Sequence, residues 1–261
     1  MNHLIFTDLD GTLLDHHSYS YQAARPALDW LASQSIPVVL VSSKTASEMK
    51  DLQQELDLQH PFVSENGGGI YLPEGYFEGR RGPLRAETLG ATRAELLDFI
   101  APYYDQYKFV GFDRMSAEEV AQSTGLPLER AQQAKEREFS EPLLWQDRPE
   151  AAKELAHAAQ VAGYKLVRGG RFWHLMGPTD KAGALISLSG RYQKMWDQKP
   201  VTIALGDSPN DIGMLEAANV AVVLSAQENA PLKLHHSGQV LRPEGAGPTG
   251  WCQAMQQYFG F

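Results

Sequence analysis

The segment FTDLDGTLLD, residues 6–15, has two carboxylates at the end of a predicted apolar strand. The run HLIF, from His3 to Phe6, leads into Asp8 and Asp10, which stand two residues apart and are followed by Gly-Thr. Two carboxylates this close repel each other, and each loses hydration free energy when it is buried. The pair therefore predicts a bound cation or a chemical use for the carboxylates.

Short apolar runs alternate with amphipathic segments along most of the chain. Apolar runs at 3–8, 37–42, 61–66, 201–207 and 220–225 have the length and composition of buried strands. Apolar residues recur every three or four positions in 21–34, 45–57, 180–197 and 209–218, which predicts helices. Strands that are apolar on both faces and alternate with helices indicate a parallel sheet covered on both sides. The predicted fold is therefore α/β, with a doubly wound, Rossmann-like parallel-sheet core.

The middle of the chain interrupts this alternation. Helices are predicted near 91–106, 116–137 and 149–162, and short strands are predicted in KFVGF, YKLVRGG and RFWHLM. Gly-Pro pairs at 82–83 and 177–178 mark the ends of this region. We therefore expect a catalytic core formed by residues 1–83 and 179–261, with an inserted α+β cap domain at 84–178.

Composition limits the function classes. The chain has 261 residues, 43% of them hydrophobic, which is enough for one or two domains. A net charge of -9, without any Lys/Arg block, argues against nucleic acid and against anionic membranes as partners. One cysteine, Cys252, excludes an internal disulfide, and the N-terminus lacks a signal-peptide pattern. A cytoplasmic location is expected, and no apolar run approaches the ~20 residues that span a bilayer.

Groups suited to phosphate or metal follow three of the predicted core strands. Asp8 and Asp10 follow the first strand, Ser42 and Ser43 the second, and Asp207 the fourth. Ligands of open parallel sheets bind at the C-terminal ends of the strands, so one site could collect these groups. An oxygen-rich cluster of this kind suits Mg²⁺, a hard cation that binds carboxylates, waters and substrate phosphates.

A structural and a functional interpretation are both available for Asp211, Lys181 and Ser42. Asp211 in SPND either completes a helix cap begun by Ser208 or joins the metal cluster. Lys181 follows Thr179, a predicted N-cap, and a cation in a first helical turn is disfavoured by the helix dipole, which favours a phosphate-binding role over a solvated surface lysine. Ser42 precedes a predicted Thr45–Glu48 capping box and is either a turn residue or a phosphate ligand.

The paired carboxylates fit phosphoryl transfer in two steps. Asp8 can attack phosphorus and form an aspartyl phosphate, which divides one difficult reaction into two easier ones. Asp10 can then protonate the leaving alcohol and later deprotonate the hydrolytic water. This mechanism needs two carboxylates rather than one.

Four motifs, DLDGTLLD, VSSK, DKAGAL and GDSPNDIGML, together resemble the haloacid dehalogenase-like superfamily of aspartate-nucleophile phosphatases. The insertion is similar to the type IIB cap of its Cof-like branch. Within that branch, SSKT, SENGGGIY, KEREFSEP, RFWHLMG and GPTGW resemble the mannosyl-3-phosphoglycerate phosphatases. The resemblance implies Asp8 as nucleophile, Asp10 as acid/base, and Ser42 and Lys181 as phosphoryl ligands. It also implies Mg²⁺ held by Asp8, the Asp10 carbonyl and Asp207, with support from Asp211.

Substrate contacts are expected on both sides of the junction between core and cap. Ser43 remains an alternative to Ser42, and Glu65-Asn66 either border the site or form only a turn. Arg137 could bind a carboxylate, although an Arg-Glu helix end is often a solvated face, and His174 beside Trp173 could be purely structural. The expected substrate-binding residues are Ser43, Lys44, Asn66, Arg137, Ser140, Arg171, His174 and Asn210.

The expected function is a Mg²⁺-dependent phosphatase of a small-molecule phosphorylated sugar. The resemblance makes mannosyl-3-phosphoglycerate the first substrate to consider, with mannosylglycerate and phosphate as products. Alternatives are a phosphohexomutase similar to phosphomannomutase, a generic Cof-like sugar phosphatase, and a binding module without catalysis. A monomer or a homodimer is expected.

Overall fold

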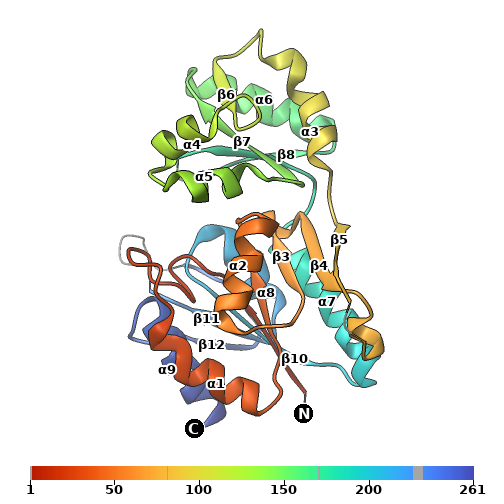
Figure 1. Cartoon of the computed structure of the whole chain (residues 1–261), viewed down its shortest axis with the longest axis vertical. Helices are drawn as coiled ribbons and strands as arrows, with labels where there is room; N and C mark the ends of the chain where they lie inside the picture. Colours follow the sequence, from red (N-terminus) through yellow and green to blue (C-terminus); the bar gives the residue numbers. More distant parts are fainter. Residues whose placement is uncertain (1, 81, 170, 226–231) are drawn as a thin grey trace.

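Two β-sheets organise the chain in the computed structural model, which describes residues 2–80, 82–169, 171–225 and 232–261 (Figure 1). The larger sheet has eight strands in the order β12-β11-β10-β1-β2-β3-β4-β5. Its first six strands in this order are parallel, and β4 and β5 are antiparallel additions at one edge. The strands are β1 His3–Thr7, β2 Val38–Val41, β3 Phe62–Ser64, β4 Gly69–Pro73, β5 Leu84–Thr88, β10 Val201–Gly206, β11 Val220–Val223 and β12 Gln239–Leu241.

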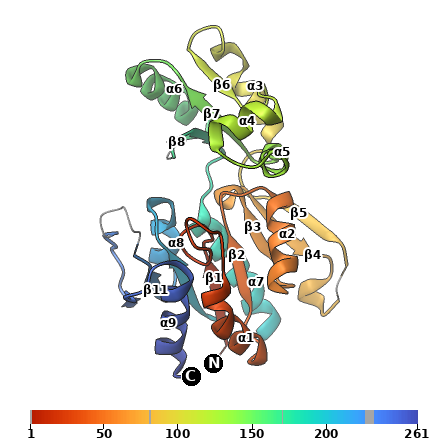
Figure 2. The ribbon, with the colours of Figure 1, turned by 60° about the vertical axis from the view of Figure 1, so that its left-hand side comes forward.

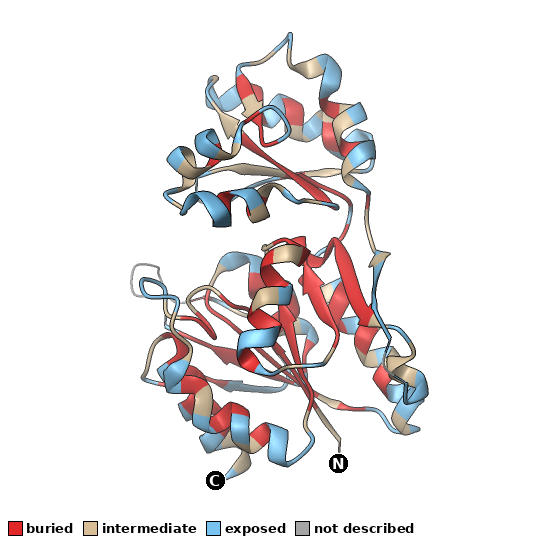
Figure 3. Cartoon of the chain, in the orientation of Figure 1, coloured by how far each residue is buried: buried red, intermediate tan, exposed pale blue. Residues whose placement is uncertain are grey.

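Helices cover both faces of this sheet because successive strand residues point to opposite sides. Ile5 and Leu40 pack in the apolar cluster that contains residues of α1, α2 and α9, whereas Phe6 and Val39 pack in the cluster that contains residues of α7 and α8. The buried strands between these layers are visible in Figure 3. The doubly wound core predicted from the sequence is confirmed. Its helices are α1 Arg25–Ser33, α2 Ala46–Leu56, α7 Lys181–Trp196, α8 Ile212–Ala217 and α9 Gly247–Phe259, with short 3-10 turns η1 Gln22–Ala24, η2 Glu65–Gly67, η3 Tyr76–Glu78 and η5 Pro209–Asp211.

The smaller sheet belongs to the inserted segment and is antiparallel, in the order β6-β7-β9-β8. Neighbouring β7 residues Leu143 and Leu144 pack in two different apolar clusters, so both faces of this sheet are covered. Helices α4 and α5 lie on the side toward the core, and α3 and α6 lie on the other side (Figures 1 and 2). The elements are α3 Arg93–Ile100, η4 Ala101–Tyr103, β6 Phe109–Gly111, α4 Ala117–Thr124, α5 Leu128–Lys135, β7 Ser140–Trp145, α6 Pro149–Val161, β8 Lys165–Arg168 and β9 Trp173–Met176.

Several local features differ from the sequence-based expectations, among them strand β12 and helix α9, which were not predicted. The helix predicted at 116–137 is two helices, because Gly125 takes a left-handed φ of 81° and Pro127 precedes α5. β7 follows in a region without a predicted strand. β4 and β5 were also not predicted, and β5 extends the core sheet although 84–88 was assigned to the cap.

No helix in the described ranges is long and apolar enough to cross a membrane.

Candidate active site

Parallel pairing of β1 and β10 brings the carboxylates from the two ends of the chain together. Thr7 is paired with Leu205 in the sheet, and the Asp8 N–H donates to the Leu205 carbonyl at 3.0 Å. Asp207 therefore follows β10 at the same edge at which Asp8 follows β1. Carboxylate oxygens of Asp8, Asp207 and Asp211 all lie within 4.8 Å of one another.

The ammonium group of Lys181 lies among these carboxylates. Its Nζ is 2.5 Å from Asp8 Oδ1 and 2.6 Å from Asp211 Oδ1, and the side chain is only 1% exposed. Lys181 lies in the first turn of α7, as expected, and is the first residue of that helix. The predicted N-cap was wrong: Asp180 caps the helix by accepting from the Gly183 N–H, while the Thr179 hydroxyl donates to the Gly67 carbonyl at 2.8 Å.

The pKa values of the clustered residues are shifted by burial and by the excess of negative charge. Burial, together with the Asp211 carboxylate, raises the pKa of Asp8 to about 8 despite the opposing effect of Lys181. Burial and Asp211 also raise the pKa of Asp207. Burial alone would lower the pKa of Lys181, but Asp211 and Asp8 outweigh it and raise that pKa. The three carboxylates, only partly neutralised by one ammonium group, therefore form a donor set that a divalent cation fits in both charge and ligand type.

The turn after Asp10 supports Asp207. Gly11 has a φ of 80°, and a Cβ at this position would lie 2.6 Å from Asp207 Oδ2, so only glycine fits. The Thr12 hydroxyl donates to Asp207 Oδ1 at 3.0 Å. Sequence reasoning did not assign a role to either residue, although the Gly-Thr that follows the paired aspartates was the available signal.

Asp211 both caps a helical turn and lies in the carboxylate cluster. Its Oδ2 accepts from the Ser208 N–H and hydroxyl, both at 3.0 Å, and so caps the short helical turn η5. Its Oδ1 accepts from Lys181. The cap therefore fixes the direction in which Asp211 presents its second oxygen to the cluster.

Asp10 lies beside the cluster and pairs with a lysine from the second strand end. Its Oδ2 is 2.9 Å from Lys44 Nζ, whereas its buried Oδ1 has no hydrogen-bond partner among the described residues. Burial lowers the pKa of Lys44, but Asp10 and Glu48 outweigh this effect and raise it. Lys44 is therefore a stable cation at the edge of the site.

Hydrogen bonds of the backbone and of side chains connect the other predicted site residues near the end of β2. The buried Ser42 accepts the Lys44 N–H on its hydroxyl at 3.3 Å, and its carbonyl accepts the Asn66 N–H at 2.8 Å. Asn210 donates from its side chain to Asn66 Oδ1 at 3.1 Å. The Ser43 carbonyl accepts from Arg137 of the cap, at 3.3 Å. These contacts leave the choice between the Ser42 and Ser43 hydroxyls open.

Arg137 and Ser140 reach the core through Glu65. The Arg137 side chain is 9% exposed and donates to the Ser140 hydroxyl oxygen at 3.0 Å. The Ser140 hydroxyl donates in turn to Glu65 Oε2 at 2.6 Å. Arg137 is therefore not on a solvated face, and Glu65, for which only a bordering or turn role was foreseen, joins the core to the cap.

The structure places Arg171 and His174 in different surroundings within the cap. Arg171 is exposed and donates to the Ser123 carbonyl at the end of α4. His174 lies on β9 opposite Pro142, and burial together with Arg137 lowers its pKa to about 4. His174 therefore faces the same part of the cap as Arg137, as a neutral imidazole.

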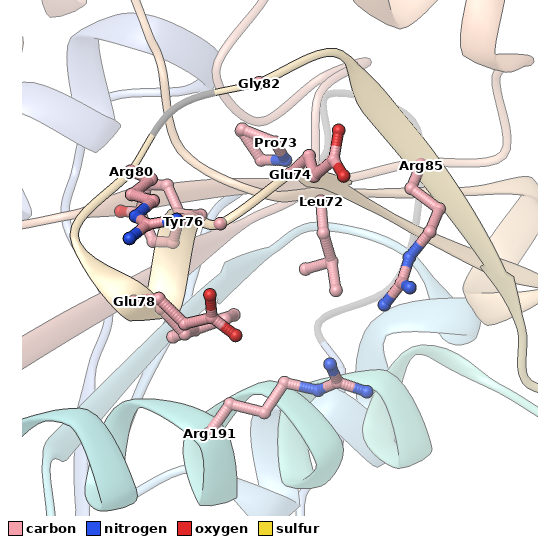
Figure 4. A pocket seen from close by; sticks show the side chains of 11 residues that line it. Leu72, Pro73, Glu74, Tyr76, Glu78, Arg80, Gly82, Arg85 and Arg191 are labelled. Carbon is pink, nitrogen blue, oxygen red and sulfur yellow. The ribbon is translucent and has the colours of Figure 1, made fainter.

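A cavity of about 540 Å³ lies elsewhere, between the β4–β5 hairpin and α7 (Figure 4). Arg85 and Arg191 extend toward one another across it. Both arginines are paired with Glu87, and the cavity contains none of the clustered carboxylates. This cavity is therefore not part of the candidate active site.

Comparisons with known proteins agree with this arrangement. A haloacid dehalogenase-like hydrolase family model matches residues 5–123. A glucosyl-3-phosphoglycerate/mannosyl-3-phosphoglycerate phosphatase of Methanococcoides burtonii is 36% identical over 268 residues, covering 100% of this chain and 98% of the relative.

Two solved structures share the fold. A phosphatase of the haloalkanoate superfamily from Bacteroides thetaiotaomicron has a TM-score of 0.70 at 17% identity, covering 100% of this chain and 96% of its own. A subclass IIB sugar phosphatase of that superfamily has a TM-score of 0.65 at 15% identity and 99% coverage of both chains. The expected core with a subclass IIB type of insertion is thus confirmed.

Proposed function

The chain belongs to the haloacid dehalogenase-like hydrolases, and from this membership we propose that it is a Mg²⁺-dependent phosphatase of a phosphorylated sugar derivative. The proposed substrate is mannosyl-3-phosphoglycerate or its glucosyl counterpart, the two substrates in the name of the relative from M. burtonii. The products are the glycosylglycerate and inorganic phosphate. The observation that carries the proposal is the convergence of Asp8, Asp207, Asp211 and Lys181 at one edge of the sheet.

In the first step, a carboxylate oxygen of Asp8 attacks phosphorus while the bond from phosphorus to the leaving alcohol breaks. Asp10 donates its proton to the leaving oxygen. Lys181 holds Oδ1 of Asp8 at 2.5 Å, which orients the carboxylate for attack with its other oxygen.

In the second step, a water molecule attacks phosphorus of the aspartyl phosphate. Asp10 takes the proton of this water, and the bond between phosphorus and the Asp8 oxygen breaks, which restores both carboxyl groups. Oδ1 of Asp10, which has no hydrogen-bond partner among the described residues, is the oxygen atom that exchanges this proton in the proposed mechanism.

Asp8 and Asp207 would hold the divalent cation, with Asp211 supporting them. Once bound, it would neutralise negative charge on the phosphoryl oxygens. Asp211 and Asp8 keep Lys181 protonated, and Thr12 and Gly11 fix the position of Asp207. The chain's own residues thus keep the cluster in place before substrate arrives.

The cap supplies the contacts for the rest of the substrate. Arg137 lies within 3.3 Å of the Ser43 carbonyl, so its guanidinium stands at the phosphate-binding strand end and can bind the glycerate carboxylate. The hydroxyl of Ser42 or of Ser43 would bind phosphoryl oxygens. Closure of the cap over these groups excludes water from the reaction.

A phosphate-release screen tests the proposal. We expect release from mannosyl- and glucosyl-3-phosphoglycerate with Mg²⁺ and loss of release with a chelator. Simple hexose phosphates should be poorer substrates. A preference for them would instead indicate a general sugar phosphatase, and a product that keeps its phosphate would indicate a mutase.

A further inference from the structure

A second cavity, of about 240 Å³, lies where the cap meets the core beside Lys44. Its core wall includes Tyr19 and Leu52, and its cap wall is the connection between α4 and α5. In Figure 1, α2 and α5 face each other across this junction. The residues used in the argument are Tyr19, Lys44, Leu52, Leu126, Pro127 and Arg130, all of which line the cavity.

Tyr19 is held in the cavity wall by a strained turn. It has a φ of 56°, which is a rare conformation for a bulky residue, and it remains 52% exposed. The Tyr19 N–H donates to the Asp15 carbonyl at 3.0 Å, and the Asp15 side chain accepts from the Ser18 N–H at 2.8 Å. A strained backbone that presents an exposed aromatic ring is typical of a binding site rather than of packing.

One side chain, that of Lys44, lies between the cavity and Asp10, the proposed proton donor. Lys44 Nζ lies 5.5 Å from the centre of the Tyr19 ring and 2.9 Å from Asp10 Oδ2. The alcohol that leaves phosphorus must lie next to Asp10 to receive its proton. Because Lys44 contacts Asp10 and also lines the cavity, groups attached to that alcohol can reach the cavity past Lys44.

We propose that this cavity is the subsite for the hexosyl ring of the substrate, with the ring packed on Tyr19 and against Leu126. The proposal rests on the proposed function and specifies how the sugar is recognised. The volume of the cavity is below the ~300–1,000 Å³ usual for drug-sized ligands, which suits one sugar ring. Tyr19, Leu52, Leu126 and Pro127 cover the apolar face of a sugar, and Lys44 and Arg130 can bind its hydroxyls.

Contacts between core and cap fix the distance between the walls of the cavity. The Thr45 hydroxyl donates to the Gln133 carbonyl at 2.9 Å, and the Gln133 side chain donates to Asp51 Oδ2 at 2.6 Å. Arg130 lies 3.7 Å from the same Asp51 oxygen. The subsite is therefore complete only when the cap is docked on the core, so sugar binding and cap closure favour each other.

The test compares mannosyl-3-phosphoglycerate with 3-phosphoglycerate, which lacks the sugar. The readout is the ratio of kcat/KM for these two substrates. Leu126→Trp fills the cavity and should lower this ratio at least tenfold. Tyr19→Asn removes the ring but keeps a residue that tolerates the left-handed backbone, and should also lower the ratio, whereas Tyr19→Phe should retain it.

Leu128→Trp is the matched control, because Leu128 is 45% exposed and does not line the cavity. It should behave as the wild-type chain. An unchanged ratio in folded Leu126→Trp and Tyr19→Asn overturns the subsite while leaving the phosphatase assignment intact. If the wild-type chain releases no phosphate from any glycosylated phosphoglycerate, both the proposed function and the subsite are wrong.

Discussion

Lys181 shows how one side chain can depend on residues distant in sequence. Its position at the first residue of α7 is unfavourable for a cation, because a helix N-terminus carries partial positive charge. Contacts of 2.5 and 2.6 Å with Asp8 and Asp211 outweigh that repulsion. In return, the ammonium group makes it possible to bury two carboxylates whose mutual repulsion would otherwise be uncompensated.

Asp8→Asn should abolish catalysis, because an amide is too weak a nucleophile to attack phosphorus. We expect phosphate release to fall by roughly 10³-fold or more, as for the loss of other catalytic nucleophiles. The measurement is steady-state phosphate release with Mg²⁺ present.

Asp57→Asn provides the control for this change. Asp57 is exposed at the end of α2 with a φ of 56°, a conformation that asparagine also adopts readily. Its activity should equal that of the wild-type chain. Undiminished release from Asp8→Asn would remove Asp8 from the role of nucleophile.

The 3-10 turn η2 connects the site to the cap through an unusual backbone. Glu65, Asn66 and Gly67 have φ values of 50°, 57° and 96°, so three consecutive residues are left-handed. A Cβ on Gly67 would lie 2.1 Å from the Asp180 carbonyl oxygen. The turn thus packs directly against the start of α7, on which Lys181 is carried.

Gly67→Ala should therefore destabilise the chain much more than Gly125→Ala. Both substitutions place alanine in a left-handed conformation, which costs ~1–2 kcal/mol. At Gly125 nothing lies within 4 Å of the added Cβ, so no further cost is expected. At Gly67 the collision with backbone brings the loss to about 3 kcal/mol or more. Urea denaturation of both variants measures the difference, and equal midpoints would contradict the predicted close packing.

Glu65 fastens the cap segment to the core by its carboxylate. It is 1% exposed, and it accepts the N–H groups of Glu138 at 2.9 Å and Phe139 at 3.2 Å in addition to the Ser140 hydroxyl. Hydrogen bonds to a charged acceptor contribute ~1.5–3 kcal/mol each. The same segment carries Arg137, so Glu65 positions the guanidinium over the site.

Glu65→Gln should loosen this attachment, because one carboxylate oxygen is replaced by a donor that faces other donors. Hydrogen exchange of the Glu138 and Phe139 amides should accelerate about tenfold, equivalent to ~1.4 kcal/mol of local stability. KM should rise as Arg137 loses its fixed position.

Glu150→Gln is the corresponding control at an exposed position of α6. It should change neither the exchange of these two amides nor KM. Exchange in Glu65→Gln at wild-type rates would show that other contacts hold the cap.

Core and cap have largely separate apolar interiors. Two apolar clusters belong to the core and two to the cap. Phe139 of the cap segment joins a core cluster, where its ring lies 6.3 Å from the Tyr71 ring, measured between ring centres. The remaining contacts described above are polar, so the cap can move relative to the core without opening either apolar interior.

Mg²⁺ should stabilise the folded chain more at about pH 8 than at about pH 5. The pKa of Asp8 is 3.8 ordinarily and about 8 in the folded chain. The metal-free protein therefore loses stability as pH rises through this interval, because ionisation is less favourable in the folded state. A cation binds the ionised form and offsets part of this loss, by ~2.7 kcal/mol at a concentration of one hundred times Kd.

Thermal unfolding with and without Mg²⁺ at both pH values measures this effect. Asp207→Asn removes one proposed ligand and should reduce the rise in Tm at about pH 8. The same rise in Tm at both pH values, or in wild type and variant alike, would place the cation elsewhere.

Local sequence patterns were sufficient for five strands of the parallel core and for the central charged cluster, although not for strand β12 or helix α9. Strand and helix periodicity is a property of consecutive residues, so the runs at 3–8, 37–42 and 201–207 could be assigned without knowledge of their neighbours. The cluster followed from the rule that parallel strands end at a common edge, which places Asp207 near Asp8.

Local sequence patterns did not predict strand β7, the hairpin strands β4 and β5, or the attachment of Glu65 to the cap. β7 is a strand because it lies between β6 and β9, and Glu65 is buried because residues 138–140 supply its donors. These features depend on partners that are distant along the chain, and no local periodicity specifies which distant segments pair. The position of Arg137, and with it the proposed binding of the substrate carboxylate, therefore arises only when the cap folds against the core.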